Sequence, residues 1–415
     1  MQPVLCHLVL AFFQLSYLRT SASPVRSGGG FGVWINARED TTTTPTAPSN
    51  PSNPNPSREY TALQAWKSAI TEDPSGNLVS WVGPDVCSYN GVFCSEPPES
   101  ISSSSPVVSG IDLNRANLKG SLVKELSFLT YLSFLHLNSN RFSGTIPDSF
   151  GELLHLTELD LSNNQFTGHF PVSTLLIPEL VYLDLRFNSF SGEVPDELFV
   201  KNLDAIFLNN NQFEGQIPMS LWASPASVIT LANNRFSGSI PASFGYMGSS
   251  IREVLFLNNM LTGCVPEGVG FLSDVEVLDL SFNSLTGQLP SSLSCLSDIE
   301  VLNIAHNLLS GELPNMVCDL KSLLNLTVSY NFFSGFSQDC DNLSYRDVGF
   351  DFSRNCVPGR NKQRPPPECM GIPGGDLSCL RIPSTKAIAC TGAMNRRGGV
   401  ADLPYRSSNL LPSLP

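Results

Sequence analysis

Residues 135–147 read LHLNSNRFSGTIP, and the pattern returns as LDLSNNQFTGHFP at 159–171 and LDLSFNSLTGQLP at 278–290. Each copy places two apolar residues around one variable residue, then an asparagine, a glycine and a proline. Because side chains alternate along a strand, the two apolar residues predict a short strand with one buried face. The glycine predicts the point where the backbone turns out of that strand.

The unit recurs through most of the chain at intervals of 23 to 25 residues. Its first strand position falls at Ile111, Leu135, Leu159, Leu183, Ile206, Ile229, Val254, Leu278, Leu302, Leu326 and Phe350. So regular a period predicts an α/β fold, namely a leucine-rich-repeat solenoid of plant-type 24-residue repeats. We expect a parallel β-sheet on its concave face and disulfide-capped ends.

An asparagine lies five residues after that first strand position in ten of the eleven units, and Ala116 replaces it in the first. A buried amide can donate to and accept from backbone groups of its own and the neighbouring turn. We therefore expect a ladder of asparagine side chains along the solenoid. The ladder residues are Asn140, Asn164, Asn188, Asn211, Asn234, Asn259, Asn283, Asn307, Asn331 and Asn355.

Composition changes along the chain predict its domain organisation. An apolar run followed by small residues near Ala22 and Ser23 is typical of a secretory signal peptide. Runs such as TTTTPTAPSNPSNPNPS at 41–57 cannot bury enough apolar surface to fold. The predicted segments are a signal peptide at 1–23, a low-complexity leader at 24–58, an N-terminal cap at 59–105, the solenoid at 106–360, a Cys-rich C-terminal cap at 361–390 and a disordered tail at 391–415.

Cysteine number and position predict the caps. Eleven cysteines become ten when Cys6 leaves with the signal peptide, an even number that suits an oxidising compartment. We expect a Cys87–Cys94 disulfide in the N-terminal cap. The last six cysteines allow 15 pairing arrangements. Of these we expect sequential pairing, namely Cys318–Cys340, Cys356–Cys369 and Cys379–Cys390. The two remaining cysteines, Cys264 and Cys295, lie in adjacent repeats and are candidates for a further pair. A zinc site is disfavoured because no CxxC is present.

The sequence shows no catalytic constellation and no cofactor site. The spacings HExxH, GxSxG and the P-loop are all absent. Asp160, Asp184 and Asp279 recur at one repeat position, which could suggest glycosidase carboxylates. A repeated position in stacked strands explains this alignment better, so we expect a protein that is not an enzyme and holds no metal.

The charge distribution favours a basic ligand. The chain has 24 Lys and Arg against 37 Asp and Glu, a net charge of −13, which argues against nucleic-acid binding. Positions before, between and after each apolar pair should be exposed on the concave face, where acids outnumber the single fixed cation. The predicted ligand-binding residues are Phe134, His136, Glu158, Asp160, Tyr182, Asp184, Arg186, Phe187, Phe207, Glu253 and Asp279.

Aromatic residues, the Cys-rich tail and two sequons leave more than one possible location for the ligand-binding site. We expect Phe134, Tyr182, Phe187 and Phe207 to be exposed together as binding anchors, with mutual covering as the alternative. The Cys-rich tail at 336–390 is a second candidate site. The sequons at Asn325 and Asn342 predict N-glycosylation.

Several motifs resemble the N-terminal half of plant leucine-rich repeat extensins over roughly residues 60–370. They include CSYNGVFC, LDAIFLNNNQF, VLNIAHNLLSG and RNCVPGRNKQRPPPEC. The resemblance implies secretion to the cell wall and binding of rapid-alkalinisation-factor peptides, which are small basic hormones, in wall-integrity and growth control. A membrane receptor kinase is a further candidate partner in trans. No Ser-Pro run follows Cys390, which departs from the family pattern and leaves covalent wall anchoring open.

Two alternatives belong to other classes. The first is an inhibitor of microbial wall-degrading enzymes, similar in repeat type to polygalacturonase inhibitors. The second is a structural wall protein that binds pectin, although an acidic face would repel that polyanion. No segment beyond the signal peptide is apolar enough to insert into a membrane.

Overall fold

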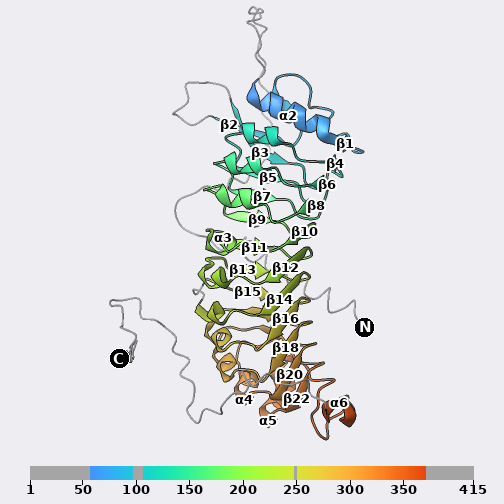
Figure 1. The fold of residues 1–415 in the computed structure, drawn as a ribbon, viewed down its shortest axis with the longest axis vertical. Coiled ribbons are helices and arrows are strands. Elements are labelled where there is room, and N and C mark those ends of the chain that lie inside the picture. Colours follow the sequence, from blue (N-terminus) through green and yellow to red (C-terminus); the bar gives the residue numbers. More distant parts are fainter. Residues whose placement is uncertain (1–56, 97–105, 247–249, 371–415) are drawn as a thin grey trace, which may run out of the picture. The chain divides into compact units, whose positions relative to one another are not determined.

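The computed structural model describes residues 57–96, 106–246 and 250–370, which belong to the second of two units, Asn55–Pro415. The predicted signal peptide, nearly all of the leader, the disordered tail and the Cys379–Cys390 pair lie outside the described residues. Within them, the repeats stack one on another as a solenoid (Figure 1). The predicted α/β solenoid of parallel strands is confirmed.

The apolar pairs of the repeats form the predicted sheet. From β3 onward each three-residue strand pairs in parallel with its neighbours in the same register, and only β2 runs antiparallel to β3. The strands are β2 (Val92–Ser95), β3 (Val107–Asp112), β5 (Phe134–His136), β7 (Glu158–Asp160), β9 (Tyr182–Asp184), β11 (Ala205–Phe207), β13 (Val228–Thr230), β15 (Glu253–Leu255), β17 (Val277–Asp279), β19 (Val301–Asn303), β21 (Asn325–Thr327) and β23 (Gly349–Asp351).

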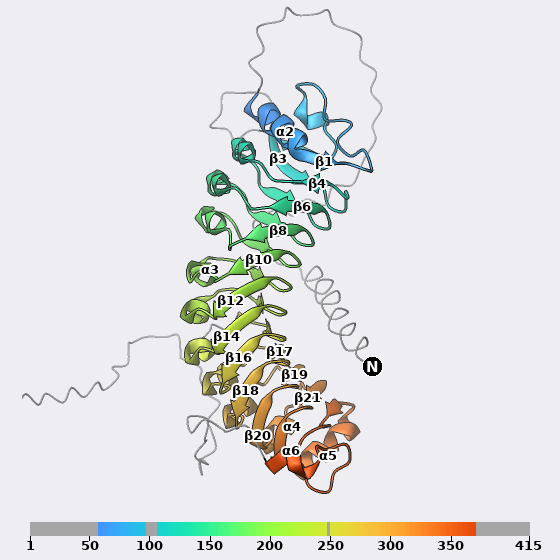
Figure 2. The same cartoon turned by 45° about the vertical axis from the view of Figure 1, so that its right-hand side comes forward.

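A second sheet, which the sequence pattern did not predict, is formed by segments that follow the ladder position of most repeats. It lies beside the first sheet in both views (Figures 1 and 2). Its strands pair in parallel except that β1 meets β4 antiparallel. They are β1 (Ile70–Glu72), β4 (Lys119–Gly120), β6 (Arg141–Gly144), β8 (Gln165–Gly168), β10 (Ser189–Gly192), β12 (Gln212–Gln216), β14 (Arg235–Ser239), β16 (Met260–Gly263), β18 (Ser284–Gly287), β20 (Leu308–Glu312) and β22 (Phe332–Gly335).

Apart from α2, the helices are five residues long or shorter, and most of them are 3₁₀. The α-helices are α2 (Arg58–Ala69), α3 (Glu197–Val200), α4 (Asn315–Cys318), α5 (Gln338–Asp341) and α6 (Pro366–Met370). The 3₁₀ helices are η1 (Val86–Ser88), η2 (Lys124–Phe128), η3 (Asp148–Glu152), η4 (Val172–Leu176), η5 (Met219–Ala223), η6 (Ala242–Tyr246), η7 (Glu267–Phe271), η8 (Ser291–Cys295) and η9 (Asn342–Arg346).

The predicted asparagine ladder is present. The Asn164 amide nitrogen donates to the carbonyl of Leu137 in the preceding repeat at 2.9 Å and to that of Leu161 in its own repeat at 3.2 Å. Its side-chain oxygen accepts from the Phe142 amide at 3.0 Å. The same three-way pattern continues to Asn355, so the ladder satisfies backbone groups that the turns leave unpaired.

A column of phenylalanine rings fills the core beneath the second sheet. Phe142, Phe166, Phe190, Phe213 and Phe236 stack with centroid separations of 6.2–6.5 Å. All five rings are fully buried. Each therefore adds apolar burial to its own repeat and to the next, which ties neighbouring repeats together.

The N-terminal cap closes the exposed end of this column. Helix α2 begins at Arg58, where Ser57 accepts a capping hydrogen bond from the Tyr60 amide at 3.1 Å. Trp66 on α2 stacks on Phe142 at 5.8 Å. The helix ends at Ala69, and Ile70 begins β1.

The disulfide predictions for the described residues are confirmed at both ends. Cys87–Cys94 closes the N-terminal cap, and Cys318–Cys340 and Cys356–Cys369 hold the last repeats. Cys264 and Cys295 are both disulfide-bonded, and their pairing with each other stays a prediction.

Candidate ligand-binding surface

The outward positions of the first sheet form the surface that the sequence predicted to bind a ligand, here called the sheet face. Parallel register places Phe134 beside Glu158, and Glu158 beside Tyr182. In the next row it places His136 beside Asp160. Strands β5, β7 and β9 therefore bring five of the predicted residues together.

A histidine–carboxylate pair lies at the centre of this group. His136 Nε2 is 3.0 Å from Glu158 Oε2. Partial burial opposes protonation of His136, but the hydrogen bond and charge of Glu158 outweigh it and raise the pKa of the imidazole. The same hydrogen bond lowers the pKa of Glu158, so the pair favours the charged form.

Aromatic rings border this pair on its N-terminal side. The Phe134 ring lies 5.1 Å from that of His136 and 5.6 Å from that of Phe93. Phe93 was not among the predicted residues, although 49% of it is exposed. Its position between two bonded cysteines in CSYNGVFC was the available signal. Gly110 makes room for Phe134, because a Cβ there would lie 2.0 Å from the ring.

Asp160 is tied into a polar network next to the pair. Its carboxylate accepts from the Ser162 amide at 3.0 Å and from the Ser162 hydroxyl at 2.5 Å. Asn138 donates to the same hydroxyl at 2.5 Å. The carboxylate is half-buried, so part of its charge still faces solvent.

Three predicted residues are not exposed as expected. Asp184 and Asp279 are buried, and Phe207 is 8% exposed. Strands only about 4.8 Å apart allow side chains in adjacent rows to cover one another. The Tyr182 ring lies 5.8 Å from Phe207, and the Arg186 guanidinium lies over Phe207 at 4.7 Å. The expectation of an exposed four-ring cluster is therefore wrong for Phe207, and mutual covering is observed.

Asp184 is a buried acid with a strong partner. Arg186 Nε lies 2.9 Å from its carboxylate, and the Tyr182 hydroxyl donates to it at 3.3 Å. Burial nevertheless dominates and raises the pKa of Asp184 to about 7. Burial likewise raises the pKa of Asp279, whose carboxyl accepts from Ser281 and Asn303.

The remaining two predicted residues lie apart from this group. Phe187 follows β9 in a left-handed turn, with φ 54°, and is 39% exposed. It therefore lies at the edge of the sheet face and not within it. Glu253 begins β15, three strands beyond β9, and is half-buried.

No group of three or more His, Cys, Asp or Glu in the described segments could hold a metal ion. None of the helices described has the length and apolar character that a membrane crossing requires.

Comparisons with known families agree with this fold. Residues 56–95 match the leucine rich repeat N-terminal domain, and residues 130–190, 274–296 and 298–320 match leucine rich repeats. Leucine-rich repeat extensin-like protein 7 of Arabidopsis thaliana is 58% identical over 63% of this chain and 60% of its own length. Leucine-rich repeat extensin-like protein 6 of the same plant is 49% identical over 55% of this chain and 48% of its own length.

Solved structures with a similar fold include a receptor kinase ectodomain with a bound peptide hormone. The PEPR1–AtPEP1 complex has a TM-score of 0.62 at 28% identity, over 71% of this chain and 45% of that chain. The ectodomain of the Arabidopsis receptor kinase HAESA, bound to an IDA peptide hormone, has a TM-score of 0.61 at 29% identity, over 72% and 49%.

The chain spans 60% or less of the length of the two curated relatives described above. Within the matched region it is similar in sequence to them, and its fold resembles that of the HAESA leucine-rich repeat ectodomain. This chain thus has a leucine-rich repeat fold and, over the matched region, is similar to leucine-rich repeat extensin-like proteins of Arabidopsis thaliana.

Proposed function

We propose that this protein is a secreted recognition protein of the plant cell wall, whose repeat domain binds a small basic peptide of the rapid-alkalinisation-factor type. The homology to leucine-rich repeat extensin-like proteins and the similarity to peptide-bound ectodomains support this proposal. The peptide would act in wall-integrity or growth control, with a membrane receptor kinase as partner in trans. The protein itself would carry out no catalysis.

The observation that carries the proposal is the excess of negative charge on the sheet face. Glu158, Asp160 and Glu253 are half-buried there, and Asp112 and Asp351 are exposed near its two ends. Arg186 is the one fixed cation among the face positions of the described strands, and Asp184 already pairs with it. A cationic peptide would therefore meet carboxylates with little competing positive charge.

Aromatic residues next to the carboxylates would provide the apolar part of the interface. Phe93 and Phe134 lie on one side of Glu158, and Tyr182 lies beside it on the next strand. Aromatic side chains surrounded by polar groups are common anchors of binding energy. Because β5, β7 and β9 hold these groups on a rigid sheet, little ordering would be needed when a peptide binds.

Calorimetric titration of the disulfide-intact protein with a panel of such basic peptides tests the proposal. We expect binding that weakens with added salt, because exposed charges are screened. The Glu158→Gln/Asp160→Asn variant should lose about tenfold or more in affinity. The matched control is Glu214→Gln/Glu312→Gln, which removes two exposed carboxylates from β12 and β20 of the second sheet.

Equal affinities in the two variants would contradict the sheet face as the peptide site. Absence of binding to every peptide, with binding to a microbial polygalacturonase, would favour the enzyme-inhibitor alternative. Binding to pectin alone would favour the structural alternative.

A further inference from the structure

One turn position carries large side chains in four consecutive repeats near the C-terminal end of the sheet. The residues are Phe282, His306, Tyr330 and Arg354, each 24 residues after the previous one and each with φ between 53° and 58°. Left-handed backbone disfavours bulky residues and tolerates asparagine. Other repeats mostly follow that preference, with Asn163, Asn210, Asn233 and Asn258 at this position.

The three rings form a stack. Phe282 and His306 lie 4.1 Å apart at 11°, and His306 and Tyr330 lie 4.1 Å apart at 12°. Phe282 is 42% exposed and Tyr330 is 40% exposed. Because the rings cover one another's inner faces, the stack presents mostly ring edges to solvent, and ring edges carry partial positive charge.

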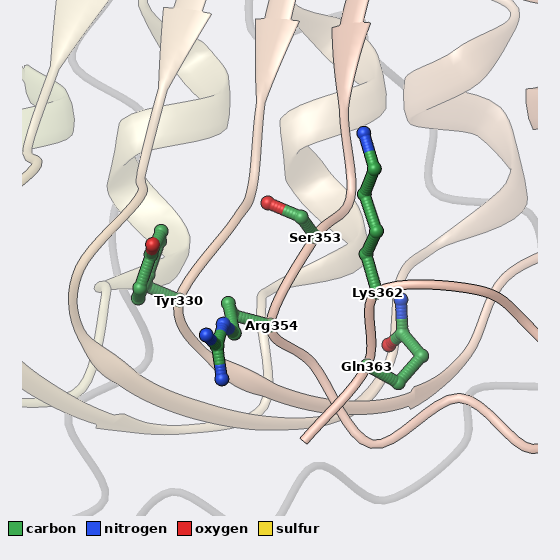
Figure 3. A pocket seen from close by; sticks show the side chains of 5 residues that line it. All are labelled: Tyr330, Ser353, Arg354, Lys362 and Gln363. Carbon is green, nitrogen blue, oxygen red and sulfur yellow. The ribbon is translucent and has the colours of Figure 1, made fainter. Parts of the chain in front are cut away.

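A cationic hollow of about 420 Å³ continues the stack. It is lined by Tyr330, Ser353, Arg354, Lys362 and Gln363, and Tyr330 and Arg354 lie at neighbouring turns on one side of it (Figure 3). No carboxylate of the described residues lies within 4.0 Å of the charged nitrogens of Arg354 or Lys362. Two cations that form no ion pair with the described residues therefore share one hollow in a chain of net charge −13.

The walls of the hollow are fixed by other contacts. The Gln363 side chain donates to the Phe352 carbonyl and accepts from the Val357 amide, both at 3.2 Å. The nearest acid on the adjoining strand, Asp351, accepts from the Ser353 amide at 3.0 Å. Arg354 and Lys362 are also joined through their backbones, since the Arg354 amide donates to the Lys362 carbonyl at 2.7 Å.

We propose that this hollow binds a carboxylate of an extended acidic peptide segment of a partner protein, and that the Phe282–His306–Tyr330 stack supports the neighbouring peptide backbone. Arg354 and Lys362 would bind the carboxylate, and peptide carbonyl oxygens would lie against the ring edges. Sugars pack on ring faces, whereas the inner faces here are covered, so the stack favours a peptide over an acidic polysaccharide. This site goes beyond the proposed function, because it takes a ligand of opposite charge at the far end of the sheet from Glu158.

Fluorescence anisotropy with a labelled alternating Gly-Glu octapeptide tests the site in the full chain. We expect salt-sensitive binding of this probe and none of the Gly-Gln octapeptide. Arg354→Asn should weaken binding about tenfold, and Tyr330→Asn should weaken it severalfold. Asparagine suits the left-handed backbone, so both variants should fold.

The matched control is Arg115→Asn, which makes the same change at the same turn position of the first repeat, where φ is 55°. It should leave probe binding unchanged. Equal losses in Arg354→Asn and Arg115→Asn would overturn the proposal, because they would indicate only a general charge effect. Binding of a galacturonate oligomer with the same dependence on Arg354, in place of the Gly-Glu probe, would also overturn it. Titration of Arg354→Asn with the basic peptides separates this site from the proposed function, which should be unaffected.

Discussion

Single side chains show where the repeat pattern predicts structure and where it does not. Asn164 and the other ladder residues were predictable because one residue type recurs at one place and meets the same backbone groups each time. The burial of Asp184 was not predictable, because it depends on three neighbours of different types. These neighbours are Tyr182, Arg186 and Phe207, and each residue type occurs only once at its repeat position. The repeat pattern therefore does not indicate the contact.

The raised pKa of Asp184 gives a prediction about stability. The carboxyl binds its proton more tightly in the folded protein, with a pKa of about 7, than in the unfolded chain, at about 3.9. Folding is therefore favoured at low pH, and this contribution is lost as pH rises from about 4 to 7. Between pH 4 and 7 the free energy of unfolding of the wild-type protein should fall. That of Asp184→Asn should change less with pH across the same window.

Urea denaturation at several pH values between 4 and 8 checks this expectation. Asp204→Asn is the control, because Asp204 is exposed at the approach to β11. A wild-type curve parallel to that of Asp184→Asn throughout the window would show that the buried carboxyl does not titrate there.

At the scale of elements, the first sheet was predictable and the second was not. The alternation of apolar residues specifies β5 to β23, because its period matches the pleat. The strands of the second sheet pair across only two to three residues of each neighbour, a stretch too short for an alternation of apolar residues to indicate a strand. Their pairing follows from stacking of the repeats, which places successive QFTG- or SFSG-type segments side by side.

The N-terminal cap offers a matched pair of tryptophans for a second prediction. Trp66 and Trp81 are both fully buried and lie 5.8 Å apart. Trp81 Nε1 donates to the Asn90 carbonyl at 2.9 Å, whereas Trp66 Nε1 has no hydrogen-bond partner in the described structure. Replacement by phenylalanine removes the same volume at both sites but breaks a hydrogen bond only at Trp81.

We therefore expect Trp81→Phe to lower the free energy of unfolding by about 1 kcal/mol more than Trp66→Phe does. Denaturation curves of the two variants, measured side by side with the wild-type protein, give the difference directly. A larger loss for Trp66→Phe would mean that the Trp66 indole nitrogen has a partner in solution.

At the scale of the whole solenoid, each repeat contacts only its neighbours, so the two ends have one packed side fewer than the middle. The caps compensate at both ends with a covalent link close to the last packed layer. Cys87–Cys94 lies beside β2, and Cys356–Cys369 follows β23. The sequence predicted these links because the cysteines flank the repeats. The Phe282–His306–Tyr330 stack was not predicted, because large residues at a turn that favours asparagine gave no sign of mutual contact.

This one-dimensional architecture predicts that loss of a cap loosens only the nearest repeats. Cys356→Ser/Cys369→Ser should increase amide exchange in β21 and β23, while β9, β11 and β13 keep wild-type protection, because opening energies in a solenoid depend on distance from the weakened end. Cys87→Ser/Cys94→Ser is the matched variant at the other end, and its effect should be confined to β2, β3 and β5. Hydrogen–deuterium exchange with mass spectrometry resolves these segments. Uniform loss of protection in either variant would indicate that the repeats unfold as one cooperative unit, in which case the acidic sheet face and the C-terminal hollow would share a single stability.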